Sequence, residues 1–166
     1  MTMHWFDLTP IDDSYFETAD FVYTYGMDLR AGADEVWRGL TGAGPLSWCR
    51  LLTDVHYTSP APHGPATTRV AKVAGGVMQL REQFFVWDEE QRRHAFYVEQ
   101  ANVPLFRSFA EDYRVQSTPT GSRFVWTFAF TPRPGFGPAV RLGLPVNKAL
   151  FASFVRDTRR HFGAVN

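Results

Sequence analysis

The stretch TTRVAKVAGGVMQLREQFFVW, residues 67–87, contains two runs in which apolar and polar residues alternate. The pair Gly75-Gly76 separates the runs, and two glycines in this position predict a tight β-hairpin. If the two glycines form the loop, Arg69 lies directly opposite Glu82, with both side chains on one face of the hairpin. An antiparallel hairpin therefore occupies the middle of the chain.

Strand-like runs with local turns between them continue on both sides of this hairpin. They cover residues 21–30, 54–59, 67–74, 77–87, 92–100, 107–117 and 123–132. Consecutive short strands joined by local turns favour an antiparallel meander.

Helical patterns follow the first run and end the chain. AGADEVWRGLTG, residues 31–42, predicts a short helix capped by Gly32 or Asp34, and GPLSWCRLL, residues 44–52, a second short helix or a turn. Residues 137–162 predict an amphipathic helix that Pro145 kinks or restarts. Its apolar face contains Val146, Leu150, Phe151, Phe154, Thr158 and Phe162.

Composition limits the classes of function. The 166 residues are typical of one domain, and Lys+Arg and Asp+Glu both count 17, so we expect no nucleic-acid partner. We find no apolar run of membrane-spanning length and no signal-peptide pattern, so we expect a cytoplasmic protein. The sequence leaves the oligomeric state open.

Metal and cofactor signatures are absent from the sequence. Cys49 is the single cysteine, and the histidines at 4, 56, 63, 94 and 161 form no metal-binding pair. Neither a nucleotide-binding glycine loop nor a GxSxG elbow occurs. We therefore expect no metal and no cofactor.

Aromatic residues make up 16% of the chain, with 15 Phe, 5 Trp and 6 Tyr. Two interpretations stay open at this point. The rings line a ligand cavity, or they build an aromatic-rich core.

The order of elements resembles the START-like superfamily, also called birch-pollen-allergen-like or SRPBCC proteins. MDLRAGADEVWRGLTG, residues 27–42, is similar to the family's first strand and helix. LREQFFVWDEEQRRHAFYV, residues 80–98, and FAEDYRVQSTPTGSRFVWTFAFTP, residues 109–132, are similar to its central hairpins, especially in the bacterial polyketide cyclase/dehydrase-like branch. The resemblance covers residues 20–162, whereas 1–19 and 132–138 have no counterpart.

The resemblance implies an α+β helix-grip fold. A curved antiparallel sheet of about seven strands wraps around a long C-terminal helix, with two short helices after the first strand. A ligand cavity opens between sheet and helix. We expect a lead-in over residues 1–19 and a single START-like domain over residues 20–166.

The Arg69–Glu82 pair is predicted to face this cavity. The opposite face of the hairpin contains Lys72, Gln79, Arg81 and Gln83, which mark the solvent side. A carboxylate inside needs a partner, and Arg69 supplies one. The pair is a structural ion pair, or a polar anchor for a ligand.

The direction of His94 depends on the loop before it. With an odd loop over residues 87–91, His94 faces Phe84 and Phe96 faces Glu82; with a four-residue loop, His94 points outward. The resemblance favours the inward orientation, because an aromatic residue matching Phe96 lines the family's cavity. His94 is then an acid–base group together with Glu82, or a wall residue.

The remaining candidates come from side-chain alternation. Phe109, Tyr113 and Val115 are predicted inside, with Glu111 a second interior carboxylate or an exposed acid. By the same rule the residues predicted inside on the last strand are Phe124, Trp126, Phe128 and Phe130. Trp48 is a gate at the cavity mouth, or a core anchor. The candidate ligand contacts are Tyr25, Met27, Trp48, Arg69, Phe84, Phe96, Val98, Phe109, Tyr113 and Trp126.

Three functions compete. The first is binding of a small hydrophobic molecule, aromatic or polycyclic. The second is a cofactor-free cyclase or dehydratase that uses His94 or Glu82 as acid–base group. The third is a protein-interaction module with a vestigial cavity, similar to the chaperone co-activators of the superfamily.

Overall fold

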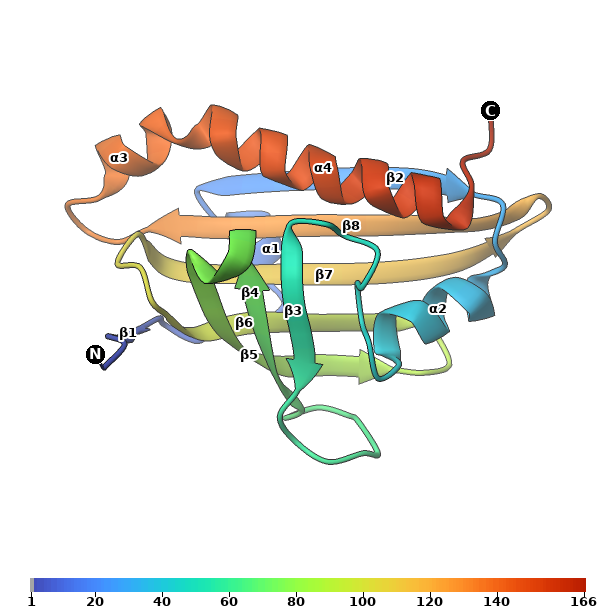
Figure 1. Ribbon diagram of the computed structural model, residues 1–166, viewed down its shortest axis with the longest axis horizontal. Coiled ribbons are helices and arrows are strands. Elements are labelled where there is room, and N and C mark those ends of the chain that lie inside the picture. Colours follow the sequence, from blue (N-terminus) through green and yellow to red (C-terminus); the bar gives the residue numbers. More distant parts are fainter. Residues whose placement is uncertain (1) are drawn as a thin grey trace.

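The computed structural model describes residues 2–166 and has the α+β architecture expected from the sequence (Figure 1). Its strands are β1 (Phe6–Asp7), β2 (Phe21–Leu29), β3 (Leu52–Tyr57), β4 (Thr68–Val73), β5 (Met78–Asp88), β6 (Arg93–Ala101), β7 (Phe106–Thr118) and β8 (Gly121–Pro132). Its helices are α1 (Tyr15–Thr18), α2 (Ala33–Thr41), the 3₁₀ turn η1 (Ala74–Gly76), α3 (Gly137–Leu142) and α4 (Leu144–Phe162).

Seven antiparallel strands form one curled sheet in the order β2-β8-β7-β6-β5-β4-β3, and α4 lies across it (Figure 1). β1 adds to this sheet beside β6, where Phe6 pairs with Ala101. The helix-grip expectation is confirmed.

The β4–β5 hairpin has the predicted register, with Arg69 opposite Glu82. Gly75 and Gly76 adopt φ values of 70° and 93°. Glycine reaches these angles without a steric penalty, and two consecutive positive φ angles give the turn that matches the twist of a hairpin. The local sequence therefore determines the alignment of the two strands.

The β5–β6 hairpin departs from both predicted registers. Its loop has four residues, 89–92, because Asp88 pairs with Arg93, yet His94 is fully buried. An irregularity between Phe84 and Val86 inserts one residue into β5 and reverses the alternation beyond it. Phe84 consequently pairs with Phe96, and Trp87, not Phe84, faces His94.

Glu82 is likewise opposite Val98 and not opposite Phe96. This pairing continues the register of Phe84 and Phe96, and the second shift, between Arg81 and Glu82, changes the pairing only from Arg81 onward, where Arg81 pairs with Gln100. His94 therefore points inward, as the resemblance implied, but the predicted odd loop is wrong.

The predicted second short helix is a turn. Residues 45–48 form turns, and Leu46 adopts a φ of 59°, which a right-handed helix does not accommodate. At the C-terminus the predicted restart is confirmed, since α3 ends at Leu142 and α4 begins one residue before Pro145. Val146 leaves the predicted apolar face, because its side chain is 71% exposed.

Rings from β8 and α4 pack against each other in one part of the core. Phe128 stacks on Phe151 with ring centroids 3.9 Å apart, and Trp126 stacks on Phe154 at 5.9 Å. The predicted inward residues of β8, Phe124, Trp126, Phe128 and Phe130, are all buried. These stacks fix α4 over the sheet and leave the remaining space on the β3–β5 side.

Residues 2–19 are packed against the domain as well. The Tyr15 hydroxyl donates to the carbonyl oxygen of Ser108 and lies 2.8 Å from the hydroxyl of Thr131, and the ring of Phe16 stacks with that of Phe85. Residue 1 of the predicted lead-in lies outside the described residues.

Candidate functional site

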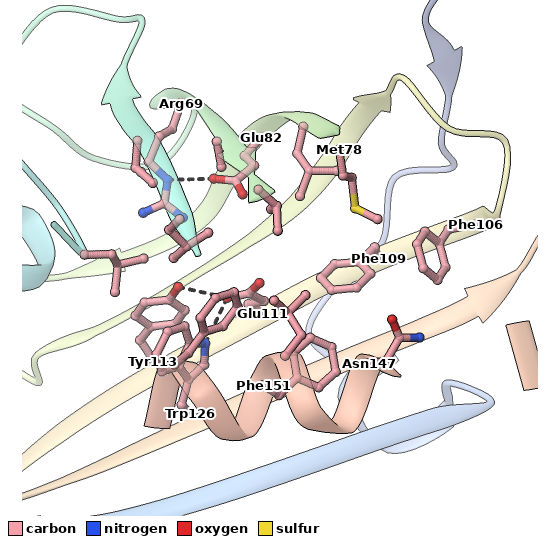
Figure 2. Close-up of a pocket in the computed structure, with 18 residues that line it drawn as sticks. Arg69, Met78, Glu82, Phe106, Phe109, Glu111, Tyr113, Trp126, Asn147 and Phe151 are labelled. Carbon is pink, nitrogen blue, oxygen red and sulfur yellow. Dashed lines mark hydrogen bonds and ion pairs between the residues drawn. The ribbon is translucent and has the colours of Figure 1, made fainter. Parts of the chain in front are cut away.

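A cavity lies between α4 and the inner face of the sheet (Figure 2). Its lining is mostly apolar, and the ionisable groups in it come from β4, β5 and β7. The lining residues are Leu46, Leu52, Val55, Arg69, Ala71, Val73, Met78, Leu80, Glu82, Phe106, Phe109, Glu111, Tyr113, Trp126, Asn147, Leu150, Phe151 and Phe154.

The cavity has a closed end and an open end. Arg69, Tyr113 and Trp126 are fully buried and mark the closed end. Met78 and Asn147, on the other side of Figure 2, are half-buried, so we assign the opening to their end. The cavity volume is about 50 Å³. Small-molecule sites usually enclose about 300 Å³ or more, so the cavity is where the fold predicts it but much narrower than expected.

An ion pair spans two strands at the closed end. The Nε of Arg69 donates to Oε2 of Glu82 over 2.6 Å, and the side chains are only 1% and 3% exposed. Burial disfavours the charged guanidinium, but the Glu82 carboxylate together with Tyr113 and Tyr57 outweighs this and raises the pKa of Arg69. Burial raises the pKa of Glu82, and Arg69 opposes that rise.

Two rings flank the guanidinium. Its carbon lies 4.5 Å from the ring centroid of Phe96 and 5.1 Å from that of Phe84, at cation–π distance. Nη1 of Arg69 is buried and has no hydrogen-bond partner within residues 2–166. An unpaired buried donor is costly, so this nitrogen has capacity for one more acceptor.

Glu111 is the second carboxyl group of the cavity. Its Oε2 accepts hydrogen bonds from the Tyr113 hydroxyl at 2.8 Å and from Nε1 of Trp126 at 2.9 Å (Figure 2). Burial, reinforced by the charge of Glu82, raises the pKa of Glu111 to about 7. This carboxyl group exchanges its proton near neutral pH.

The strand pairing explains why these three residues meet. Tyr113 follows Glu111 by two positions on β7 and shares its face, and Trp126 is directly opposite Tyr113 on β8. The alternative that Glu111 is an exposed acid is wrong, because its side chain is 8% exposed.

The predicted site residues divide into three groups. Arg69, Glu82, Phe109, Tyr113 and Trp126 line the cavity. Phe84, His94, Phe96 and Val98 are buried behind that lining, and Tyr25, Met27 and Trp48 lie elsewhere.

Tyr25 and Met27 do not reach the cavity because β2 is at the far end of the sheet order from β4 and β5. The rings of β8 and α4 fill the space between; the ring of Phe128 packs edge-on against that of Tyr25. Of these two predicted ligand contacts, Met27 belongs to the core and Tyr25 is half-buried against it.

Trp48 packs against the C-terminal half of α4. Its Nε1 donates to the Thr158 hydroxyl at 3.0 Å, and its ring stacks on His161 with centroids 4.8 Å apart. The turn at residues 45–48 directs it to this flank rather than to the cavity mouth. Trp48 is therefore not a gate at the cavity mouth. It is an anchor, the alternative interpretation, and it holds the turn against α4.

His94 is enclosed by rings and does not line the cavity. The rings of Trp37, Phe84, Trp87 and Tyr113 lie within 5.2 Å of it, centroid to centroid. Neither ring nitrogen has a hydrogen-bond partner in the described part of the chain. Burial, with the charge of Arg69, lowers the pKa of His94 well below its usual range, so His94 is neutral and unsuited to proton exchange with a ligand.

Sequence reasoning missed several lining residues. Leu46, Phe106 and Asn147 lie in a turn or near the starts of β7 and α4, where side-chain alternation gives no direction. Over residues 2–166 no three His, Cys, Asp or Glu side chains are grouped to hold a metal ion. In the same residues no helix is both long and apolar enough to cross a membrane.

A curled antiparallel sheet that grips a long C-terminal helix around an apolar cavity defines the helix-grip class of proteins. The family described as polyketide cyclase / dehydrase and lipid transport matches residues 20–162, and the chain belongs to this family. The resemblance to SRPBCC proteins is thereby confirmed.

Relatives and solved structures agree with this assignment. An uncharacterised protein of Mycobacterium tuberculosis is 34% identical over 154 residues, which cover 91% of this chain and 90% of that protein. A Thermus thermophilus structure has a TM-score of 0.67 at 17% identity and covers 82% of this chain and 93% of its own. Ginseng major latex-like protein 151 from Panax ginseng has a TM-score of 0.62 at 16% identity, covering 86% and 97%.

Proposed function

We propose that the protein binds a small hydrophobic molecule in the cavity between α4 and the sheet, with its polar end at Arg69. The observation that carries the proposal is the unpartnered Nη1 of Arg69 at the closed end of an apolar cavity. Family membership supports it, since the family description includes lipid transport. Apolar walls with a few placed polar groups are typical of small-molecule sites.

The charges favour a neutral polar end. Glu82 already neutralises Arg69, and Glu111 lies on the opposite wall, so a ligand carboxylate adds a third acid to a closed space. A carbonyl or hydroxyl oxygen accepts from Nη1 of Arg69 without this repulsion. The polar end is therefore a ketone, ester or hydroxyl group.

Binding requires the cavity to widen from about 50 Å³. The half-buried side chains at the open end, Met78 and Leu150, are long and unbranched at Cβ, so they change rotamer at small cost. The ion pair at the closed end stays in place while these side chains move.

A neutral naphthylamine dye, N-phenyl-1-naphthylamine, tests the proposal. We expect its fluorescence to rise on binding, and native mass spectrometry of the expressed protein to detect a retained small molecule. Leu150→Trp narrows the opening and weakens dye binding about tenfold, which corresponds to about 1.4 kcal/mol. Ala149→Trp, which adds the same ring at an exposed position of α4, leaves binding unchanged.

Absence of both dye binding and a retained molecule would refute a ligand-binding cavity. Equal weakening by Leu150→Trp and Ala149→Trp would show that the dye binds on the surface of α4. Either result leaves a protein-interaction module, with the cavity vestigial, as the better function.

Acid–base catalysis is the second candidate, and one observation favours it. Glu111 faces the same cavity as Arg69, with a pKa of about 7, whereas His94 is sealed off and Glu82 is held by Arg69. In this version Glu111 removes a proton next to a ligand carbonyl, and Arg69 stabilises the oxygen that becomes negative. Exchange of deuterium into a bound ketone, lost in Glu111→Gln, distinguishes catalyst from carrier.

A further inference from the structure

The most exposed apolar side chains of residues 2–166 adjoin, in sequence, lining residues of the cavity or the start of α4. Leu142, Val77 and Val146 are the three most exposed large hydrophobic residues of the described chain, at 85%, 76% and 71%. Val77 directly precedes Met78, and Val146 directly precedes Asn147, and both of these neighbours line the cavity. Leu142 ends α3 immediately before α4. We call Leu142, Val77 and Val146 the rim.

Helix geometry places Val146 on the side of α4 that faces away from β2. Successive residues turn by about 100° around a helix, so Val146 and Lys148 lie on opposite flanks of Asn147. Nζ of Lys148 lies over the ring of Tyr23 on β2, 5.4 Å from its centroid. Val146 therefore projects from the other flank, on which Leu150 also lines the cavity.

The segment that contains α3 and the first part of α4 is rich in basic residues. Residues 133–156 contain no Asp or Glu but contain Arg133, Arg141, Lys148 and Arg156, in a chain whose overall charges balance. The neighbouring turns at residues 74–77 and 102–105 also lack acids, and the nearby exposed acid is Asp7 of β1, whose carbonyl oxygen accepts a hydrogen bond from Arg133. Arg141 is exposed directly beside Leu142 of the rim, and Lys148 is exposed on the opposite flank of α4, over Tyr23. The cavity therefore opens onto a surface that is apolar and cationic.

We propose that the rim docks on a lipid bilayer that contains anionic lipid. Leu142, Val77 and Val146 enter the interface, and Arg141 and Lys148 lie among the headgroups. Side chains that protrude suit a fluid interface better than a preformed protein groove. A second copy fits less well, because pairing two rims brings like charges together.

The docked orientation turns the cavity opening toward the bilayer, so that a hydrophobic molecule passes between the two without crossing water. Docking itself does not depend on the cavity being occupied. Its test is accordingly separate from that of the ligand.

Vesicle co-sedimentation tests the proposal. We expect the protein to sediment with vesicles of phosphatidylcholine and phosphatidylglycerol, to remain in solution with phosphatidylcholine alone, and to be released by salt. Leu142→Ser with Val146→Ser, and separately Arg141→Glu with Lys148→Glu, each lower partitioning at least about tenfold.

The matched control is Arg38→Glu with Arg160→Glu. It makes the same change in net charge at exposed positions of α2 and the C-terminal end of α4, at the far end of the molecule from α3 (Figure 1), and leaves partitioning unchanged. Absence of binding to anionic vesicles overturns the proposal, as does an equal loss in the control. Dimerisation that Leu142→Ser with Val146→Ser abolishes would assign the rim to a second copy instead.

Discussion

Arg69 on β4 and Glu82 on β5 lie directly opposite each other, and their side chains meet at 2.6 Å inside the protein. Both side chains are almost fully removed from the solvent outside the protein. Breaking such a pair leaves an unpaired charge in the core and costs about 3–5 kcal/mol, whereas removing both partners deletes that penalty. The pair is therefore coupled in stability.

Glu82→Ala is expected to destabilise the fold more than Glu82→Ala combined with Arg69→Ala. The physical reason is the buried guanidinium that the single change leaves without a carboxylate. Urea melts of the two single variants and the double variant measure the coupling free energy. Simple additivity of the two single effects would show that the pair contributes no coupling, and would remove the support for Arg69 as a polar anchor.

Glu111→Gln is expected to become progressively more stable than the natural protein as pH rises. The pKa of Glu111 is raised from 4.5 to about 7, so the folded state keeps a proton that the unfolded state releases between these values. Protonated Glu111 therefore contributes its full stabilisation of the fold below pH 4.5, and this contribution is lost as the pH rises to about 7. The loss is about 3 kcal/mol in total, at about 1.36 kcal/mol per pH unit.

Gln keeps the acceptor oxygen for Tyr113 and Trp126 but does not titrate. Urea melts of both proteins at several pH values between 4 and 8 check the prediction. A stability difference that is independent of pH would contradict it.

His94→Phe is expected to remove a loss of stability at acidic pH. Burial lowers the pKa of His94, so below about pH 6.5 the unfolded state binds a proton that the folded state rejects, and stability falls as pH falls. Phe suits the surrounding rings and eliminates two ring nitrogens without hydrogen-bond partners in residues 2–166. Thermal melts at pH 7 and pH 5 compare the variant with the natural protein; an unchanged difference between the two pH values would count against this assignment.

Trp48→Phe is expected to reduce stability without affecting ligand binding. The change removes the hydrogen bond to Thr158 and part of the stacking on His161, a loss of about 1–2 kcal/mol. Urea melts measure the stability, and titration with the naphthylamine dye measures binding. Weaker dye binding by the folded variant would restore Trp48 as a gate.

Gly121→Ala is expected to be strongly destabilising. Gly121 adopts a φ of 149°, and an added Cβ lies 2.1 Å from the carbonyl oxygen of Leu29. The turn between β7 and β8 then has to move away from the end of β2. Circular dichroism melts check this, and Gly64→Ala, where an added Cβ meets nothing within 4 Å, is the control.

The alternation of apolar and polar residues and the Gly75-Gly76 turn were enough to predict the meander, the Arg69–Glu82 pairing and the inward rings of β7 and β8. These features are local, because a two-residue turn sets the register and the period of two sets the face. Family resemblance supplied the helix-grip arrangement, which no single segment contains.

Tertiary structure decided the rest. A residue inserted into β5 turned His94 inward despite a four-residue loop, and a positive φ at Leu46 replaced a helix with a turn that carries Trp48 away from the cavity. Ring packing between β8 and α4 filled the space near β2, so Met27 became core and Tyr25 packs half-buried against it, and Val146 was left exposed. Bulges and packing of rings depend on contacts between distant segments, and a residue pattern along the chain does not encode those contacts.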